Sequence, residues 1–81
     1  MNKEQVFEIV KKIINEKGFD EEINLESVFT DDLGIDSLDL VDITMDCDAE
    51  FKTNISDEEL EKTHTVNDLL NIICRKLEIE L

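Results

Sequence analysis

Apolar residues in this sequence recur at the spacing of α-helices, and nowhere do they alternate as they would along a β-strand. The clearest case is the first segment, where Val6, Ile9, Val10 and Ile13 stand at positions i, i+3, i+4 and i+7. The chain has no proline and only two glycines, so few residues interrupt a helix. Its 81 residues are enough for one hydrophobic core. We therefore expect an all-α fold with a single domain over residues 1–81.

Capping signals divide the chain into a small four-helix bundle with three main helices and one short one. Asn2 with Gln5 three residues later predicts a capping box at the start of the first helix, and Thr65 with Asp68 marks the start of the last. The second helix begins at Asp36 or Ser37. The four expected helices span about residues 2–17, 37–52, 57–62 and 65–77.

The segment between the first two helices, residues 19–36, shows no sustained period, although apolar residues occur in it at irregular intervals. This pattern predicts a long ordered loop that is held to the core by its side chains, with one helical turn near Glu26–Phe29. Long ordered loops in compact domains often carry function.

The second helix has faces of different chemistry, because successive residues are turned by about 100°. The face expected to lie in the core carries Leu40, Ile43, Cys47 and Phe51. The stripe beside it is acidic and carries Asp39, Asp42, Asp46 and Glu50. The third face is apolar again and carries Leu38, Val41, Met45 and Ala49, with Asp48 at its edge. A helix that is apolar on two sides either packs between neighbours or keeps one face for a partner.

The net charge of −14 is concentrated in the middle of the chain, where residues 18–51 contain 12 Asp and Glu and no Lys or Arg. This charge argues against nucleic acid or an anionic membrane as the partner and favours basic surfaces on other proteins. No apolar run approaches membrane-spanning length and no signal segment is visible, so we expect no stable membrane insertion and a cytoplasmic location. The two cysteines form no CxxC or Cys/His cluster, and reduced thiols are the simpler interpretation.

Intrinsic catalysis and a defined metal site are both disfavoured. His64 is the only histidine, and it stands in the turn before the last helix with neither Ser37 nor a cysteine near it in the sequence. A catalytic triad also needs an orienting acid and an oxyanion hole. The acids do not follow the spacing of a calcium-binding EF-hand loop. We expect a protein that is not an enzyme.

Ser37 is the most informative single residue. A serine before an apolar-periodic run is commonly an N-cap, but Asp36 can cap the helix itself through Asp39, which leaves the Ser37 hydroxyl free. A phosphate ester at this position would lie at the positive end of the helix dipole, where an anion is stabilised by roughly 0.3–1 kcal/mol. Gly34 permits a left-handed turn that exposes the residues after it. These features indicate a site of modification.

The segment Asp32–Asp39, DLGIDSLD, resembles the phosphopantetheine attachment motif D-L-G-x-D-S-L of acyl carrier proteins. The resemblance extends over nearly the whole chain without gaps. It implies that Ser37 receives 4′-phosphopantetheine from coenzyme A through a separate Mg²⁺-dependent phosphopantetheinyl transferase. The thiol of the arm would then hold growing acyl chains as thioesters, in fatty acid biosynthesis.

The resemblance also implies two further sites. The helix after Ser37 would be the recognition helix for basic patches on acyl-transfer and fatty-acid-synthase enzymes, through Asp36, Leu38, Asp39, Val41, Asp42, Met45 and Asp48. The acyl chain would lie among the apolar faces of the helices, in a cavity formed by Leu40, Ile43, Cys47, Phe51, Leu69 and Ile73. The bundle core can open locally to admit it.

Two alternatives stay open at this point. One is a carrier for a polyketide or another specialised acyl pathway. The other comes from a different class, an acidic adaptor protein that recruits basic partners and has no prosthetic group. We expect the carrier to be a monomer.

Overall fold

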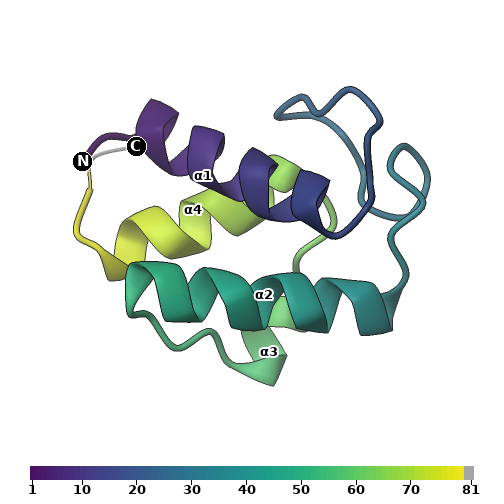
Figure 1. Ribbon diagram of the computed structural model, residues 1–81. Coiled ribbons are helices and arrows are strands. Elements are labelled where there is room, and N and C mark those ends of the chain that lie inside the picture. Colours follow the sequence, from purple (N-terminus) through teal and green to yellow (C-terminus); the bar gives the residue numbers. More distant parts are fainter. Residues whose placement is uncertain (80–81) are drawn as a thin grey trace.

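The computed structural model describes residues 1–79, and its regular secondary structure over that range is helical. The four helices are α1 (Lys3–Glu16), α2 (Ser37–Phe51), α3 (Asp57–Glu61) and α4 (Val66–Lys76). α1 packs against both α2 and α4. In Figure 1, α4 lies between α1 and α2, and the short α3 lies on the side of α2 away from α1. The predicted all-α bundle of three main helices and one short helix is confirmed.

The helix starts follow local hydrogen bonds that the sequence predicts. Asn2 Oδ1 accepts the backbone N–H of Gln5 at 2.9 Å, and Gln5 Oε1 accepts the backbone N–H of Asn2 at 2.9 Å. A similar reciprocal pair joins Thr65 and Asp68 at the start of α4. Each pair satisfies backbone donors that have no partner inside the helix.

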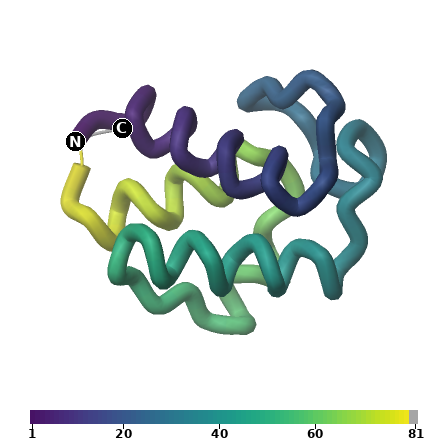
Figure 2. Tube along the Cα trace, in the orientation of Figure 1, coloured from purple at the N-terminus to yellow at the C-terminus, as the bar shows by residue number. Residues whose placement is uncertain are grey.

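The long loop between α1 and α2 is ordered against the start of α4 (Figure 2). The backbone N–H of Phe29 donates to the carbonyl of His64 at 2.9 Å, and that of Val66 donates to the carbonyl of Ser27 at 3.0 Å. An isolated antiparallel bridge joins Val28 to Thr65. Residues 26–29 themselves form no helical turn, because Ser27 and Phe29 bond to the segment at the start of α4. The i to i+4 bond of a helical turn occurs slightly later, where the carbonyl of Val28 accepts the backbone N–H of Asp32 at 2.9 Å.

A single core cluster draws side chains from α1, α2, α4 and the loop. The predicted core face of α2 is buried as expected, and Thr44 is buried beside it. The residues that are at most 2% exposed include Val10, Phe29, Ile35, Ile43, Leu69 and Ile73. Burial of Phe29 and Ile35 anchors the loop at its second half. The chain therefore enters α2 from a fixed position.

Candidate functional site

Ser37 is the first residue of α2, and its side chain is exposed. The N-cap is Asp36, whose Oδ1 accepts the backbone N–H of Asp39 at 2.8 Å. The helix start is thus capped as predicted, and the hydroxyl of Ser37 is not needed for it. Gly34 has a φ of +66°, in the left-handed region that the turn before Asp36 requires. The local sequence therefore presents one hydroxyl group at a capped helix start.

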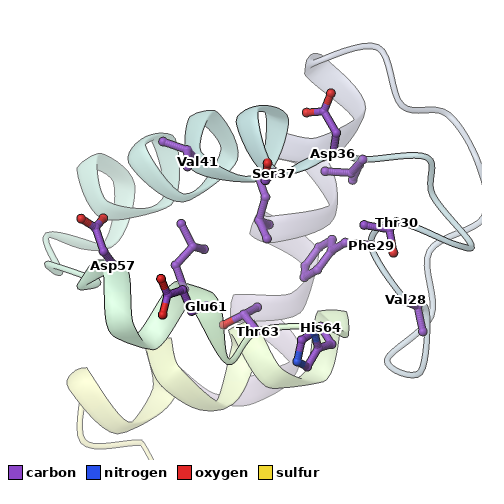
Figure 3. Close-up of a pocket in the computed structure, with 13 residues that line it drawn as sticks. Val28, Phe29, Thr30, Asp36, Ser37, Val41, Asp57, Glu61, Thr63 and His64 are labelled. Carbon is purple, nitrogen blue, oxygen red and sulfur yellow. The ribbon is translucent and has the colours of Figure 1, made fainter.

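A pocket of about 460 Å³ opens beside Ser37. Its walls come from the start of α2, from α3, from the loop before α2 and from the turn before α4 (Figure 3). Its apolar lining residues are Val28, Phe29, Ile35, Leu40, Val41 and Leu60. Its polar lining residues are Thr30, Asp36, Ser37, Asp57, Glu61, Thr63 and His64. The volume lies in the range of small-molecule pockets, about 300–1,000 Å³. A free hydroxyl thus borders a space that suits an apolar chain.

The cavity predicted from the sequence and this pocket share one residue, Leu40. The other five predicted residues are in the closed core, where each is at most 7% exposed: Ile43, Cys47, Phe51, Leu69 and Ile73. A chain in the pocket would reach them only if the core opened. Four further lining residues could not be predicted from the sequence: Phe29, Ile35, Leu60 and Thr63. The loop, the short α3 and the turn after it carry no helical period that places their side chains.

The third face of α2 is exposed, as its pattern predicts. Leu38 is 79% exposed, Val41 is 42% exposed and Met45 is 62% exposed. Large apolar side chains in one row on a helix are uncommon at a surface that faces only water. Asp42 is exposed next to them, and Asp39 is partly exposed. The combination is an apolar strip that is bordered by carboxylates.

Two carboxylates of α2 have a lysine beside them, a contact that could not be predicted from the sequence. Lys17 Nζ lies 2.8 Å from Asp46 Oδ2 and 3.8 Å from Asp42 Oδ2. The pKa of Lys17 is raised, chiefly by its hydrogen bond to Asp46. Lys17 stands just before the stretch without Lys or Arg, and the packing of α1 on α2 brings it to the acidic stripe.

Asp48 bonds within its own chain. Its carboxylate accepts the hydroxyl of Thr53 at 2.8 Å and the backbone N–H of Ile55 at 3.1 Å. Asp48 therefore stabilises the turn between α2 and α3, and this structural role is separate from its predicted role in partner recognition. Asp36, Asp39 and Asp42 are the predicted recognition acids that lie nearest to Ser37 along α2.

The other chemically active side chains are two buried cysteines and His64, which borders the same pocket as Ser37. Cys47 and Cys74 are free and buried, and burial raises the pKa of the Cys47 thiol to about 12. His64 borders the pocket, while its backbone N–H donates to Asp68 Oδ2 at 3.0 Å. Within residues 1–79 no cluster of three or more His, Cys, Asp or Glu residues could hold a metal ion. No helix in this range combines the length and the apolarity needed to cross a membrane.

Comparison with known proteins defines the class to which this arrangement belongs. Residues 4–73 match the family model described as the phosphopantetheine attachment site. This class bears a covalently attached 4′-phosphopantetheine group. The geometry fits such a group, because an exposed hydroxyl at a helix N-terminus leaves room for a phosphodiester and the adjacent pocket leaves room for a chain.

Within the class of phosphopantetheine-bearing proteins, the similar relatives and solved structures are acyl carrier proteins. The chain is 49% identical to the acyl carrier protein of Petrotoga mobilis, over 99% of this chain and 96% of that protein. It is 47% identical to the acyl carrier protein of Thermotoga maritima, over 94% and 96% of the two chains. The crystal structure of an acyl carrier protein from Thermotoga maritima superposes with a TM-score of 0.87 at 38% identity, covering 96% of this chain and 93% of that one. An acyl carrier protein from Enterococcus faecalis superposes with a TM-score of 0.78 at 34% identity, covering 94% of this chain and 99% of that one.

This chain belongs to the acyl carrier protein family. Acyl carrier proteins are carriers and not catalysts, and they work with phosphopantetheinyl transferases and the enzymes of fatty acid synthesis. The family resemblance inferred from the motif around Ser37 is confirmed.

Proposed function

We propose that this chain is a discrete, non-catalytic carrier in fatty acid biosynthesis and that Ser37 bears its 4′-phosphopantetheine arm. One observation carries the proposal: Asp36 caps α2, and so the exposed hydroxyl of Ser37 is left free at the mouth of an apolar pocket. The near full-length similarity to acyl carrier proteins supports the pathway.

The pocket beside Ser37 is the proposed entrance for the acyl chain. Leu40 and Val41 line it from α2, and Leu60 lines it from α3. Longer chains reach the buried residues Ile43 and Cys47 when the bundle opens locally, since a small core can separate at a modest free-energy cost. These successive contacts connect the pocket to the cavity that was predicted from the amino-acid sequence.

The exposed side of α2 is the proposed docking surface. Leu38, Val41 and Met45 provide the apolar contact, and Asp36, Asp39 and Asp42 face basic patches on the transferase and synthase enzymes. Contacts of this kind favour fast, reversible and salt-sensitive association, because opposite charges steer the encounter. A carrier that visits several enzymes needs such short-lived complexes.

We place the carrier in the cytoplasm as a monomer with one domain over residues 1–81. Two free, buried thiols suit a reducing compartment. The single core cluster includes residues from Val6 to Cys74, which supports one folding unit.

The attachment is tested by intact mass after incubation with coenzyme A and a phosphopantetheinyl transferase. The native chain should gain one phosphopantetheine, and Ser37→Ala should gain none. Ser56→Ala is the matched control, because Ser56 is also exposed at a helix start but caps α3 instead of lying within the helix. An unmodified native chain would favour the acidic adaptor, and modification of Ser37→Ala would show that the site is wrong.

The docking surface is tested by charge reversal. Asp39→Lys should slow modification by the transferase while the circular dichroism spectrum stays that of the native chain. Glu16→Lys is the control, since it makes the same charge change on the exposed face of α1. Equal slowing by both variants would assign the effect to net charge alone and not to α2.

A further inference from the structure

The hydroxyl of Thr44, in the middle of α2, is buried without a hydrogen-bond partner. Thr44 is 4% exposed, and its Oγ1 meets no donor or acceptor in the part of the chain that the structure describes. A buried hydroxyl normally finds a partner, often the carbonyl one helical turn earlier. Thr63, which is 5% exposed, follows that rule and donates to the carbonyl of Glu59 at 2.9 Å. Thr44 therefore needs a separate explanation.

Helix geometry places Thr44 on the side of α2 that forms the pocket wall. Ser37, Leu40 and Val41 line the pocket. At about 100° per residue, Thr44 is turned about 40° from Leu40 and lies between the directions of Leu40 and Val41. It is one turn deeper, and about 10.5 Å along the helix axis from Ser37. Figure 3 shows this wall at Ser37 and Val41, with Thr63 on the opposite side of the pocket.

We infer that Thr44 makes this carrier favour acyl chains that bear a hydroxyl or keto oxygen over saturated chains of the same length. The inference rests on the proposed function of Ser37 and its pocket. A saturated chain that passes Leu40 meets the Thr44 hydroxyl and leaves it unpaired. A keto oxygen accepts the hydroxyl proton, and a chain hydroxyl either donates or accepts. The oxygenated chain therefore gains a hydrogen bond that the saturated chain cannot form.

Thr63 supports the same assignment from the other wall. It lines the pocket and is buried, and its hydroxyl proton is engaged by the Glu59 carbonyl. Its oxygen lone pairs remain available as acceptors for a chain hydroxyl. The pocket thus offers an acceptor after α3, and the buried face of α2 beyond Leu40 offers a donor. Sites built to pair a substrate hydroxyl discriminate against analogues that lack it.

The test attaches octanoyl or hydroxyoctanoyl chains as thioesters to the phosphopantetheine-bearing protein. The hydroxyl group is placed at a different carbon in each of several hydroxyoctanoyl chains. The readout is the rate at which hydroxylamine cleaves the thioester, divided by the rate for the same acyl group on free pantetheine. In the native protein the best-placed hydroxyoctanoyl chain should be cleaved about fivefold more slowly than octanoyl, the factor expected for one added hydrogen bond. Thr44→Val should remove or reverse this preference. Thr44→Ser is the matched control and should keep it, because serine retains the hydroxyl at this position.

The stability of the unmodified protein gives a second readout. Thr44→Val should raise the urea midpoint, since it replaces an unpaired buried hydroxyl with a methyl group of similar volume. A lowered midpoint would show that the hydroxyl is paired within α2 and would overturn the inference, as would equal selectivity in the native and Thr44→Val proteins. Failure to gain the phosphopantetheine mass is detected before any thioester is made, so it would refute the proposed function separately.

Discussion

Asp48 accepts the backbone N–H of Ile55 with both carboxylate oxygens in reach, at 3.1 and 3.2 Å. The hydroxyl of Thr53 donates to the same carboxylate at 2.8 Å. These bonds close the turn after α2, where Lys52 adopts a left-handed φ of 56°. Because Ile55 is buried and leads into α3, Asp48 helps to position one wall of the pocket.

Asp48→Ala should lower the free energy of unfolding by about 1–3 kcal/mol, because it leaves the N–H of Ile55 without its acceptor. Glu50→Ala removes the same charge from an exposed position of α2 and should change stability by no more than about 0.5 kcal/mol. Urea titration of both variants measures the difference. Equal losses would show that the turn does not depend on the Asp48 carboxylate.

The parts of the structure that could be predicted from the sequence are those set by neighbouring residues. The capping pair of Asn2 and Gln5 and the cap of Asp36 on Asp39 each span three residues, and both are found. The three faces of α2 follow from its angular period alone, and the exposed Leu38 and buried Ile43 confirm them. The position of Ser37 as a free hydroxyl follows from the Asp36 cap.

The remaining features join residues that are distant in the sequence. An antiparallel bridge joins Val28 of the loop to Thr65, and it competes with the formation of a local turn. No pattern among neighbouring residues predicts this bridge. The contact of Lys17 with Asp46 depends on how α1 packs on α2. The pocket depends on Leu60 of α3, a helix too short to show a period. Such contacts need the tertiary structure.

Cys47 should make the fold sensitive to alkaline pH. Burial raises the pKa of its thiol from the ordinary 9.0 to about 12, so the unfolded chain releases this proton more readily. The stability is intact below pH 9 and declines as the pH rises toward 12. At pH 10 the native chain should have lost roughly 1–2 kcal/mol more than Cys47→Ala has, relative to pH 7. Urea titrations at the two pH values measure this difference, and parallel curves for the two proteins would contradict it.

Asp68 should make the stability of the fold sensitive to acidic pH, whereas Cys47 makes it sensitive to alkaline pH. Burial opposes its ionisation, but hydrogen bonds from the backbone N–H groups of His64 and Thr65 outweigh this and lower its pKa below the ordinary 3.8. The stabilisation is therefore present above about pH 4 and is lost as the pH falls through the lowered value. Asp68→Ala should be less stable by about 1–2 kcal/mol at pH 7. The difference from the native chain should narrow on acidification below pH 4, and a constant gap in thermal unfolding would refute the role of the charge.

Lys17 should limit the attraction between α2 and basic partners, because it already neutralises part of the acidic stripe. Its hydrogen bond to Asp46 raises its pKa above the ordinary 10.5, so the contact stays charged at neutral pH and is lost only as the pH rises through the raised value. Lys17→Gln reduces Lys and Arg from 8 to 7 and takes the net charge from −14 to −15. At low salt it should raise the association rate with the transferase about two- to threefold.

The control for Lys17 is Lys12→Gln, which makes the same change in net charge on the exposed face of α1. Stopped-flow association of both variants separates a local effect from a global one. If Lys17 shields Asp42 and Asp46, its removal must accelerate binding more than removal of Lys12 does, and added salt must shrink the difference because it screens exposed charges. Equal acceleration by the two variants would mean that the transferase responds to total charge, and the ion pair with Asp46 would then have no part in docking.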